Sequence, residues 1–301
     1  MTATMGLSVT TSLLVTLVAE GALSAGDANV ASDALREAGG APETLAWIDP
    51  GNALDLAVTA LSQPATRAAL EAALPHIDII VQSAAAPRRK SLLIADMDST
   101  MITCECIDEL ADFAGFKAEV AAVTEAAMRG ELDFAAALDA RVALLKGLDT
   151  AAIGTCLATR VHYTPGARTL VATMAANGAQ TILISGGFTV FAQPVGTALG
   201  FAQIHANTLG IAGGRLTGTV ARPIIDAAAK RAVLLSAGVP LPQTLAVGDG
   251  ANDIPMLEAA GLGVAYHAKP RAAAAADAAV RHGDLTVLLR AQGYRRSDWL
   301  T

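Results

Sequence analysis

Four short apolar runs, each without charged residues and rich in branched side chains, constrain the fold of this chain most strongly. They are SLLIA (91–95), QTILIS (180–185), QTLAVG (243–248) and GLGVAY (261–266). Such runs are typical of strands that are buried on both faces, as in a parallel sheet covered by helices on each side. The chain from Ser91 onward is therefore predicted to be an α/β domain.

A long insertion separates the first two of these runs and contains no good strand candidate. Its helix-like stretches are CIDELADFAG (106–115), AEVAAVTEAAMRG (118–130), FAAALDARVALLKG (134–147) and TAAIGTCLATR (150–160). We interpret residues 104–162, approximately, as a small helical cap. Further on, TLGIAGGRLTGTV (208–220) predicts a hairpin around Gly213-Gly214, and the alanine-rich RAAAAADAAVRH (271–282) predicts a helix.

Residues 1–84 have a different pattern and are predicted to form a separate domain. The expected elements are a strand (11–19), a helix (27–40), two strands around the turn residues Pro50-Gly51-Asn52, a helix (63–76) and a strand (77–84). This βαββαβ order is the ferredoxin-like arrangement. The small, basic stretch AAAPRRK (84–90) is a plausible boundary, and 301 residues exceed what one compact core usually needs.

The charge balance excludes some classes of partner. The formal net charge is −7, and only 16% of the residues are charged. Such a chain is not suited to coating nucleic acid or an anionic membrane surface. An anionic small substrate remains compatible, because one Lys, one Arg or a metal ion can reverse the sign of the charge inside a pocket.

The sequence also lacks the marks of export. The apolar run Leu13–Val18 is short, no Lys or Arg occurs before Arg36, and Glu20 interrupts the apolar stretch. No apolar run approaches the roughly 20 residues that span a bilayer. Three cysteines are an odd number and make a poor disulfide framework, which favours a reducing compartment. We therefore expect a soluble, cytoplasmic protein.

Two carboxylates, Asp96 and Asp98, follow the first apolar run directly. The carboxyl ends of parallel strands are where open α/β sheets bind ligands. Carboxylates so close together repel each other, and a Mg²⁺ ion beside them would make the arrangement tolerable. The alternative is a solvated strand end or a helix cap.

A second polar cluster, GDGAND (248–253), follows the third apolar run. Asp249, Asn252 and Asp253 are ligand-type residues, and the glycines permit a tight turn, so the loop suits a metal ion. The alternative is an ordinary loop, because Gly, Asn and Asp dominate turns in any case.

Two further pieces carry little weight when each is taken alone. Ser185, Gly186 and Gly187 offer a hydroxyl and successive backbone N–H groups to a phosphate oxygen, but a plain strand-to-helix turn has the same sequence. Lys230 lies at the start of an amphipathic helix, where a lysine is most often solvated.

Together and in this order, the four pieces resemble the motifs of the haloacid dehalogenase (HAD) superfamily of phosphatases over about residues 85–301. DMDST, ISGG, Lys230 and GDGAND match its first to fourth motifs. The resemblance implies a Rossmann-like HAD core with a parallel sheet and a helical cap inserted after the first strand. The stretches DMDSTMITCECIDELADFAG and ELDFAAALDARVALLKG narrow the resemblance to the phosphoserine phosphatase family. The N-terminal unit is similar to the ACT-like domain of such enzymes, but AEGALSAGD (19–27) lacks their effector-binding loop, so serine binding there stays open.

The resemblance implies catalytic and metal-binding roles for four aspartates. Asp96 would be the nucleophile that forms an aspartyl-phosphate, and Asp98 the general acid and base. Mg²⁺ would be held by the carboxylates of Asp96 and Asp249 and by the main-chain carbonyl of Asp98. Asp253 would orient these ligands.

The resemblance also implies the residues that bind substrate. Those for the phosphoryl group are Ser185, Gly186, Lys230 and Asn252. Those for the serine part are Glu105 for the ammonium, Arg141 for the carboxylate, and Met128 and Phe134 as pocket walls. Judged by the residues alone, the preferred interpretation is a helix-surface ion pair for Arg141 and a favourable first turn of a helix for Glu105; the resemblance reverses this preference.

The implied function is a Mg²⁺-dependent phosphoserine phosphatase that acts on O-phospho-L-serine in the last step of serine biosynthesis. The alternatives are a HAD phosphatase for another small phosphomonoester, and an amino-acid-sensing regulator with an inactive phosphatase core. The expected partner is the small-molecule substrate, and a homodimer is left open. A zinc site at Cys104 and Cys106 is not expected, because no second ligand pair completes four ligands.

Overall fold

The N-terminal unit is an antiparallel sheet with two helices on one face. The structure, a computed structural model, describes residues 12–128 and 131–301. The elements of this unit are β1 (Leu13–Val18), α1 (Ala25–Glu37), β2 (Ala41–Asp49), β3 (Ala53–Thr59), α2 (Gln63–Ala73) and β4 (Asp78–Ser83). Strand β1 pairs with both β3 and β4, and β2 pairs with β3, so the strand order is β4-β1-β3-β2. This is the predicted ferredoxin-like topology. Its likeness to an ACT domain stays a prediction.

Local sequence explains where the two helices of this unit begin. Ser24 caps α1 in a reciprocal capping box with Asp27, and the Ser62 side chain caps α2. The apolar faces of both helices then pack on alternate residues of the strands, with Leu35 and Leu70 fully buried. The unit therefore has a hydrophobic core of its own.

The second unit is built on a parallel sheet, as predicted. Its strands are β5 (Leu92–Ala95), β6 (Gln180–Phe188), β7 (Gln203–Asn207), β10 (Thr244–Gly248), β11 (Leu262–Tyr266) and β12 (Ala278–Val280). All five neighbouring pairs are parallel, in the order β12-β11-β10-β5-β6-β7. Along β5, Leu93 and Ala95 join one buried cluster while Leu92 and Ile94 join another. Both faces of this strand are thus covered.

The helices around this sheet are short. They are α7 (Ala167–Ala176), α8 (Thr189–Leu199), α9 (Ala227–Ser236), α10 (Ile254–Ala259), α11 (Pro270–Ala275) and α12 (Val287–Ala291), with 3₁₀ turns at Leu241–Gln243 and Arg296–Asp298. Within the described ranges, no helix has the length and apolar character needed to cross a membrane.

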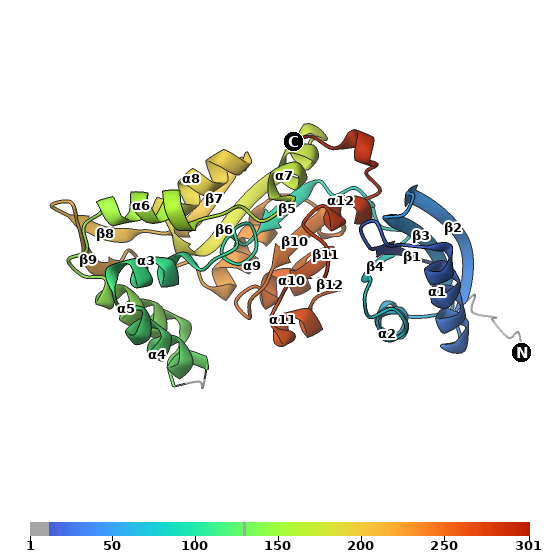
Figure 1. Cartoon of the computed structure of the whole chain (residues 1–301), viewed down its shortest axis with the longest axis horizontal. Coiled ribbons are helices and arrows are strands. Elements are labelled where there is room, and N and C mark those ends of the chain that lie inside the picture. The colour runs from blue at the N-terminus through green and yellow to red at the C-terminus, as the bar shows by residue number, and fades with distance from the viewer. Residues whose placement is uncertain (1–11, 129–130) are drawn as a thin grey trace, which may run out of the picture.

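The insertion after β5 is helical, as expected. It contains α3 (Cys106–Ala114), α4 (Lys117–Met128), α5 (Phe134–Leu144) and α6 (Ala151–Arg160). Ile102 pairs with Tyr163 where the chain enters and leaves this cap. The predicted hairpin is also present as β8 (Leu209–Ala212) and β9 (Arg215–Val220), and β9 packs against α5. The N-terminal unit and the cap lie at opposite ends of the molecule, with the parallel sheet between them (Figure 1).

Two expectations about secondary structure were wrong, and one strand was not predicted. Residues 271–282 do not form one helix, because α11 ends at Ala275 and β12 follows. Asp277 explains the break: its backbone N–H donates to Gly263 O and its carboxylate accepts from Gly263 N–H, so tertiary pairing overrides alanine's helix propensity. Strand β6 continues through Ser185 to Phe188 and does not end at Ser185. The edge strand β7, with mixed polar and apolar residues, was not predicted.

The two units share one continuous sheet. Ile79 in β4 pairs antiparallel with Ala279 in β12, which gives a sheet of 10 strands in the order β2-β3-β1-β4-β12-β11-β10-β5-β6-β7. Beside this bridge, the carboxylate of Asp78 accepts hydrogen bonds from the N–H groups of Arg281 (2.6 Å), His282 (3.2 Å) and Gly283 (2.7 Å). Asp78 is only 1% exposed. The N-terminal unit is therefore docked by a buried carboxylate held by backbone donors.

Asp78→Ala is expected to lower the free energy of unfolding by about 2–4 kcal/mol, because three backbone donors lose a charged acceptor. Urea denaturation measures this change. Asp78→Asn, which keeps one acceptor oxygen, should have a free energy of unfolding between those of the original protein and Asp78→Ala. Asp33→Ala is the matched control, since Asp33 forms an exposed ion pair with Arg36 and should cost less than about 1 kcal/mol. Equal losses for Asp78→Ala and Asp33→Ala would contradict the docking role.

Candidate active site

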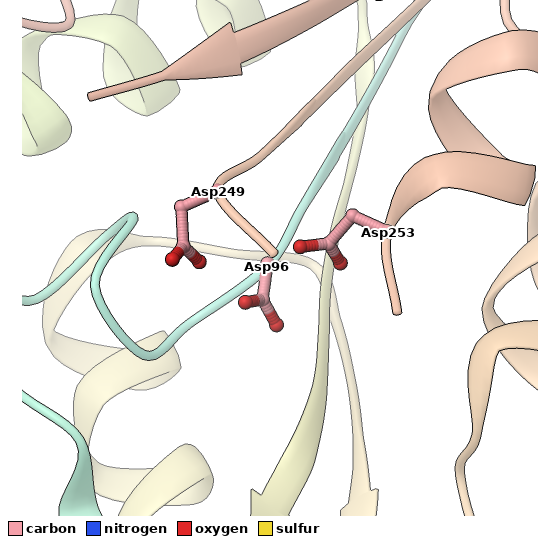
Figure 2. A group of neighbouring side chains, drawn as sticks. All are labelled: Asp96, Asp249 and Asp253. Carbon is pink, nitrogen blue, oxygen red and sulfur yellow. The ribbon is translucent and has the colours of Figure 1, made fainter. Parts of the chain in front are cut away.

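Three carboxylates converge at the carboxyl ends of two neighbouring strands. Asp96 follows β5, and Asp249 and Asp253 lie in the loop that follows β10, which pairs with β5. Figure 2 shows the three side chains turned toward one another from these two segments. Each offers an oxygen within 4.8 Å of the others, and all three residues are buried. The structure thus brings together residues that lie more than 150 positions apart in sequence.

Glycine at position 248 permits this convergence. A Cβ atom at Gly248 would lie 2.5 Å from Asp253 Cγ, closer than side chains tolerate. The carboxylate of Asp253 therefore packs directly on the backbone of the strand end. A Cβ atom at Gly250 would likewise lie 2.5 Å from Asn252 Oδ1. The two glycines of GDGAND therefore let these side chains approach the backbone closely, in addition to permitting the turn.

Lys230 is not on a solvated helix face. It projects from α9 with 0% exposure, and its Nζ donates to Asp96 Oδ1 (2.5 Å) and to Asp253 Oδ1 (2.7 Å). Burial opposes its charge, but the charges of Asp253 and Asp96 outweigh burial and raise the pKa of Lys230. The lysine is therefore charged and links the ends of β5 and β10.

The acidic cluster fits a divalent cation bound through oxygen ligands. Both oxygens of Asp253 are already engaged, by Lys230 and by Gly250 N–H at 3.0 Å. Among the described residues, the side-chain carboxylate of Asp249 receives only one long contact, of 3.5 Å, from Thr100 Oγ1. Burial, and then the charge of Asp253, raise the pKa of Asp249 to about 6, and the same two causes raise the pKa of Asp96 well above its usual range. Negative charge on Asp96 and Asp249 is therefore costly in the buried site, and a divalent cation would stabilise it, with Asp253 placed to support them.

Asp98 has an environment suited to proton transfer. Its Oδ1 atom is buried, yet no described residue forms a hydrogen bond with it. Burial, and then the charge of Glu105, raise the pKa of Asp98 to about 7. A carboxyl group that titrates near neutral pH and has a free oxygen can give and take a proton.

The last residues of β6, from Ser185 onward, form a third wall of the site. Ser185 is 1% exposed, and its Oγ accepts from Gly187 N–H at 2.8 Å, so its hydroxyl hydrogen is free to donate elsewhere. A Cβ at Gly186 would lie 3.2 Å from Phe134 Cζ of the cap and 3.7 Å from Asn252 Nδ2. Gly186 thus lies where a cap residue and the loop after β10 meet.

The cap supplies a group of charged side chains. Glu105 precedes α3 and accepts from Ser99 Oγ at 2.7 Å, and Arg141, in the last turn of α5, donates its Nε to Ala137 O at 3.3 Å. Asp108 is close to both: burial and then the charge of Glu105 raise the pKa of Asp108, and Arg141 opposes them. The cap therefore places an acidic and a basic group near each other. Met128 ends α4, and its side chain lies outside the described residues, so its role stays a prediction.

Sequence reasoning missed three contributors to this site. Asp108 has a buried Oδ1 atom without a hydrogen-bond partner among the described residues, and only its position three residues after Glu105 could have indicated it. Thr100, two residues after Asp98, places its Oγ1 3.5 Å from Asp249 Oδ1. Lys269 donates its backbone N–H to Asp249 O at 3.1 Å, a contact that no side-chain motif reveals.

Comparisons with known proteins identify the family of this chain. The model of the haloacid dehalogenase-like hydrolase family matches residues 93–258. A phosphoserine phosphatase of Streptomyces coelicolor is 47% identical over 256 residues, which are 83% of this chain and 62% of that protein, so the chain spans about three fifths of that relative's length.

Two solved structures extend the comparison. The unliganded crystal structure of a probable phosphoserine phosphatase from Vibrio cholerae has a TM-score of 0.73 and 34% identity, and the match covers 94% of this chain and 87% of that one. A phospho-aspartyl intermediate analogue of phosphoserine phosphatase has a TM-score of 0.63 and 36% identity, over 67% of this chain and 98% of that one. The chain therefore belongs to the haloacid dehalogenase-like hydrolases and, within them, to the phosphoserine phosphatase family.

Proposed function

We propose that this chain is a Mg²⁺-dependent phosphatase that hydrolyses O-phospho-L-serine to L-serine and phosphate through an aspartyl-phosphate on Asp96. The observation that carries the proposal is the buried carboxylate of Asp96, fixed at one oxygen by Lys230 and adjacent to Asp249 and Asp253. A fixed, buried carboxylate beside a cation suits nucleophilic attack on phosphorus. The reaction would supply serine at the end of its biosynthesis, in the cytoplasm.

Attack and charge stabilisation are assigned to groups from the segment after β5, from β6 and α9, and from the loop after β10. Lys230 holds Asp96 Oδ1, which leaves Oδ2 to attack phosphorus. The Lys230 charge also offsets negative charge in the phosphoryl transition state. Ser185 Oγ–H and the Gly186 N–H donate to phosphate oxygens, and Asn252, beside Gly186, helps to position the phosphoryl group.

Asp98 is assigned both proton transfers. With a pKa of about 7 it is partly protonated at neutral pH, and its Oδ1 has no competing partner among the residues described. It gives its proton to the leaving serine oxygen as the Asp96–phosphorus bond forms. The resulting carboxylate then takes a proton from the water that cleaves this bond.

The residues that would hold Mg²⁺ are Asp96, Asp249 and the main-chain carbonyl of Asp98. Asp253, with both oxygens engaged by Lys230 and Gly250, orients this set without being a ligand. When bound, the ion supplies positive charge to the phosphoryl oxygens. All of these ligands are oxygens, as Mg²⁺ prefers.

The cap is assigned the choice of substrate. Phosphoserine carries an ammonium and a carboxylate in addition to its phosphoryl group. Glu105 would pair with the ammonium, and Arg141 would bind the carboxylate through its terminal nitrogens. Phe134 lies against Gly186 and would close the pocket above the phosphoryl group, together with Met128.

Phosphate release from a panel of phosphomonoesters, with and without Mg²⁺, tests the proposal. L-phosphoserine should be among the best substrates, and EDTA should abolish its turnover. A different preferred monoester would favour another HAD phosphatase activity. Turnover of none would favour an amino-acid sensor with an inactive core, although the intact set of Asp96, Asp98, Lys230 and Asp249 argues against this. A homodimer stays a prediction.

Arg141→Ala is expected to raise KM for phosphoserine by about 10- to 100-fold, because a charged hydrogen bond to the substrate carboxylate is lost. KM for an aryl phosphate without a carboxylate should change less than about threefold. Steady-state kinetics with both substrates measures the difference. Arg160→Ala is the control, since Arg160 is a cap arginine paired with Glu109 and Asp112 on the surface. Equal effects on both substrates would contradict the role of Arg141.

A further inference from the structure

Arg67 of the N-terminal unit caps a helix of the catalytic unit. Its Nη1 donates to Ala276 O (2.5 Å) and its Nη2 to Ala273 O (3.0 Å), both at the C-terminal end of α11. Glu71, one turn further along α2, accepts from Arg67 Nε at 2.8 Å and fixes the guanidinium. The side chain is only 13% exposed. The last carbonyls of α11 thus receive their donors from another domain.

The opposite end of α11 touches the metal-binding loop. Lys269, which immediately precedes this helix, donates its backbone N–H to Asp249 O at 3.1 Å. Helix α11 also packs against α10, which begins directly after Asp253. A single helix of 6 residues therefore runs from Arg67 to the loop that carries two of the three converging carboxylates.

We infer that Arg67 is a positioning residue for the metal site, which acts through α11 on the main chain of Asp249. The inference rests on the proposed function for the identity of the metal ion. It gives the N-terminal unit a role in catalysis that needs no effector. The unit completes the support of the metal-binding loop.

The physical argument concerns the shortness of α11. A helix of this length is not stable alone, so its position depends on what holds its two ends. The planar guanidinium donates hydrogen bonds from two nitrogens to two carbonyls. It therefore fixes the C-terminal end of α11 both along the helix axis and in rotation about that axis. Metal ligands must be held within about 0.5 Å of their working positions, so a loosened α11 weakens metal binding.

The setting of Arg67 allows its effect to be separated from unfolding. Arg67 lines an open cleft of about 850 Å³ between α2 and α11, so truncation enlarges a solvent-filled space and creates no void in the core. Arg281 lines the same cleft and pairs with Glu71, as Arg67 does. Its side chain has no hydrogen bond to α11 among the described residues. Arg281→Ala is therefore a matched control.

The test measures Mg²⁺ binding to the full-length, metal-free protein by titration calorimetry, with thermal unfolding of each variant alongside. Arg67→Ala should raise the Kd for Mg²⁺ by about 3- to 10-fold, less than the loss of a group in direct contact with a metal ligand. At saturating Mg²⁺, its KM for phosphoserine should stay within about twofold of the original, because the substrate site is untouched. Arg67→Lys should recover part of the affinity, and Arg281→Ala should bind Mg²⁺ like the original protein.

Several outcomes overturn the inference. An unchanged Mg²⁺ Kd in Arg67→Ala does so, and so does an equal loss in Arg281→Ala, which would indicate general domain docking. If Arg67→Ala fails to fold, Arg67→Lys takes its place. A Mg²⁺ Kd for Arg67→Lys no higher than that for Arg281→Ala then overturns the inference. An original protein that binds no Mg²⁺ overturns the proposed metal dependence as well. Normal binding and turnover in that protein, with no change in the variants, overturns only the role of Arg67.

Discussion

Asp96→Asn is expected to reduce phosphatase turnover by at least about 10³-fold, because the amide that replaces the carboxylate is not a nucleophile toward phosphorus. The substitution preserves size, and Lys230 keeps Asp253 as its partner at 2.7 Å. The protein should therefore remain folded. Phosphate release from L-phosphoserine measures the loss, and circular dichroism measures the fold.

Two controls sharpen this prediction. Asp139→Asn changes an exposed cap aspartate that pairs with Arg222, and it should leave turnover within about twofold of the original. Acid quenching during turnover should trap phosphate on the original protein and none on Asp96→Asn. Turnover of Asp96→Asn within tenfold of the original would remove Asp96 from the role of nucleophile.

Lys230→Met is expected to lower the free energy of unfolding of the metal-free protein by about 3–5 kcal/mol and to abolish turnover. Met has a similar length but no charge, so Asp96 and Asp253 would stay buried without their cation. Burial and the charge of Asp253 already raise the pKa of Asp96 in the original protein. Urea denaturation measures the loss of stability.

The cost of Lys230→Met should depend on pH and on metal. A buried carboxylate with a raised pKa binds protons more readily in the folded than in the unfolded state, so lowering the pH should restore part of the stability. Mg²⁺ should also restore part of it. Arg231→Met is the control, because Arg231 is the next residue on α9 and is exposed, and it should change stability by less than about 0.5 kcal/mol. A similar loss in both variants would contradict the buried role of Lys230.

The parallel sheet and the residues at its strand ends were predictable from sequence for a physical reason. Strands buried on both faces must be apolar throughout, so polar residues can begin only where the strand ends, and this marks Asp96 and Asp249. The cap followed from the helical spacing of residues between β5 and β6. The ferredoxin-like order followed from alternating runs separated by turn residues.

Other features depend on contacts that no local pattern encodes. Nothing around Lys230 predicts complete burial, because its partner Asp96 lies 134 positions earlier in the chain. Strand β12 is alanine-rich, and only pairing with β11 and β4 makes it a strand. The capping of α11 by Arg67 joins residues 209 positions apart. Local sequence therefore indicates the strand ends, whereas tertiary contacts determine how they are supported.

Pairing of Ile102 with Tyr163 bears on the order in which the chain can fold. Strands β5 and β6 are neighbours in the sheet, as in the pair Leu92 and Gln180, yet the whole cap lies between them in sequence. Closing so long a loop in a disordered chain is entropically costly and slow. If the cap helices form first and bring Ile102 to Tyr163, the span left to close becomes short. Folding rate should therefore respond to substitutions at this bridge more than unfolding rate does.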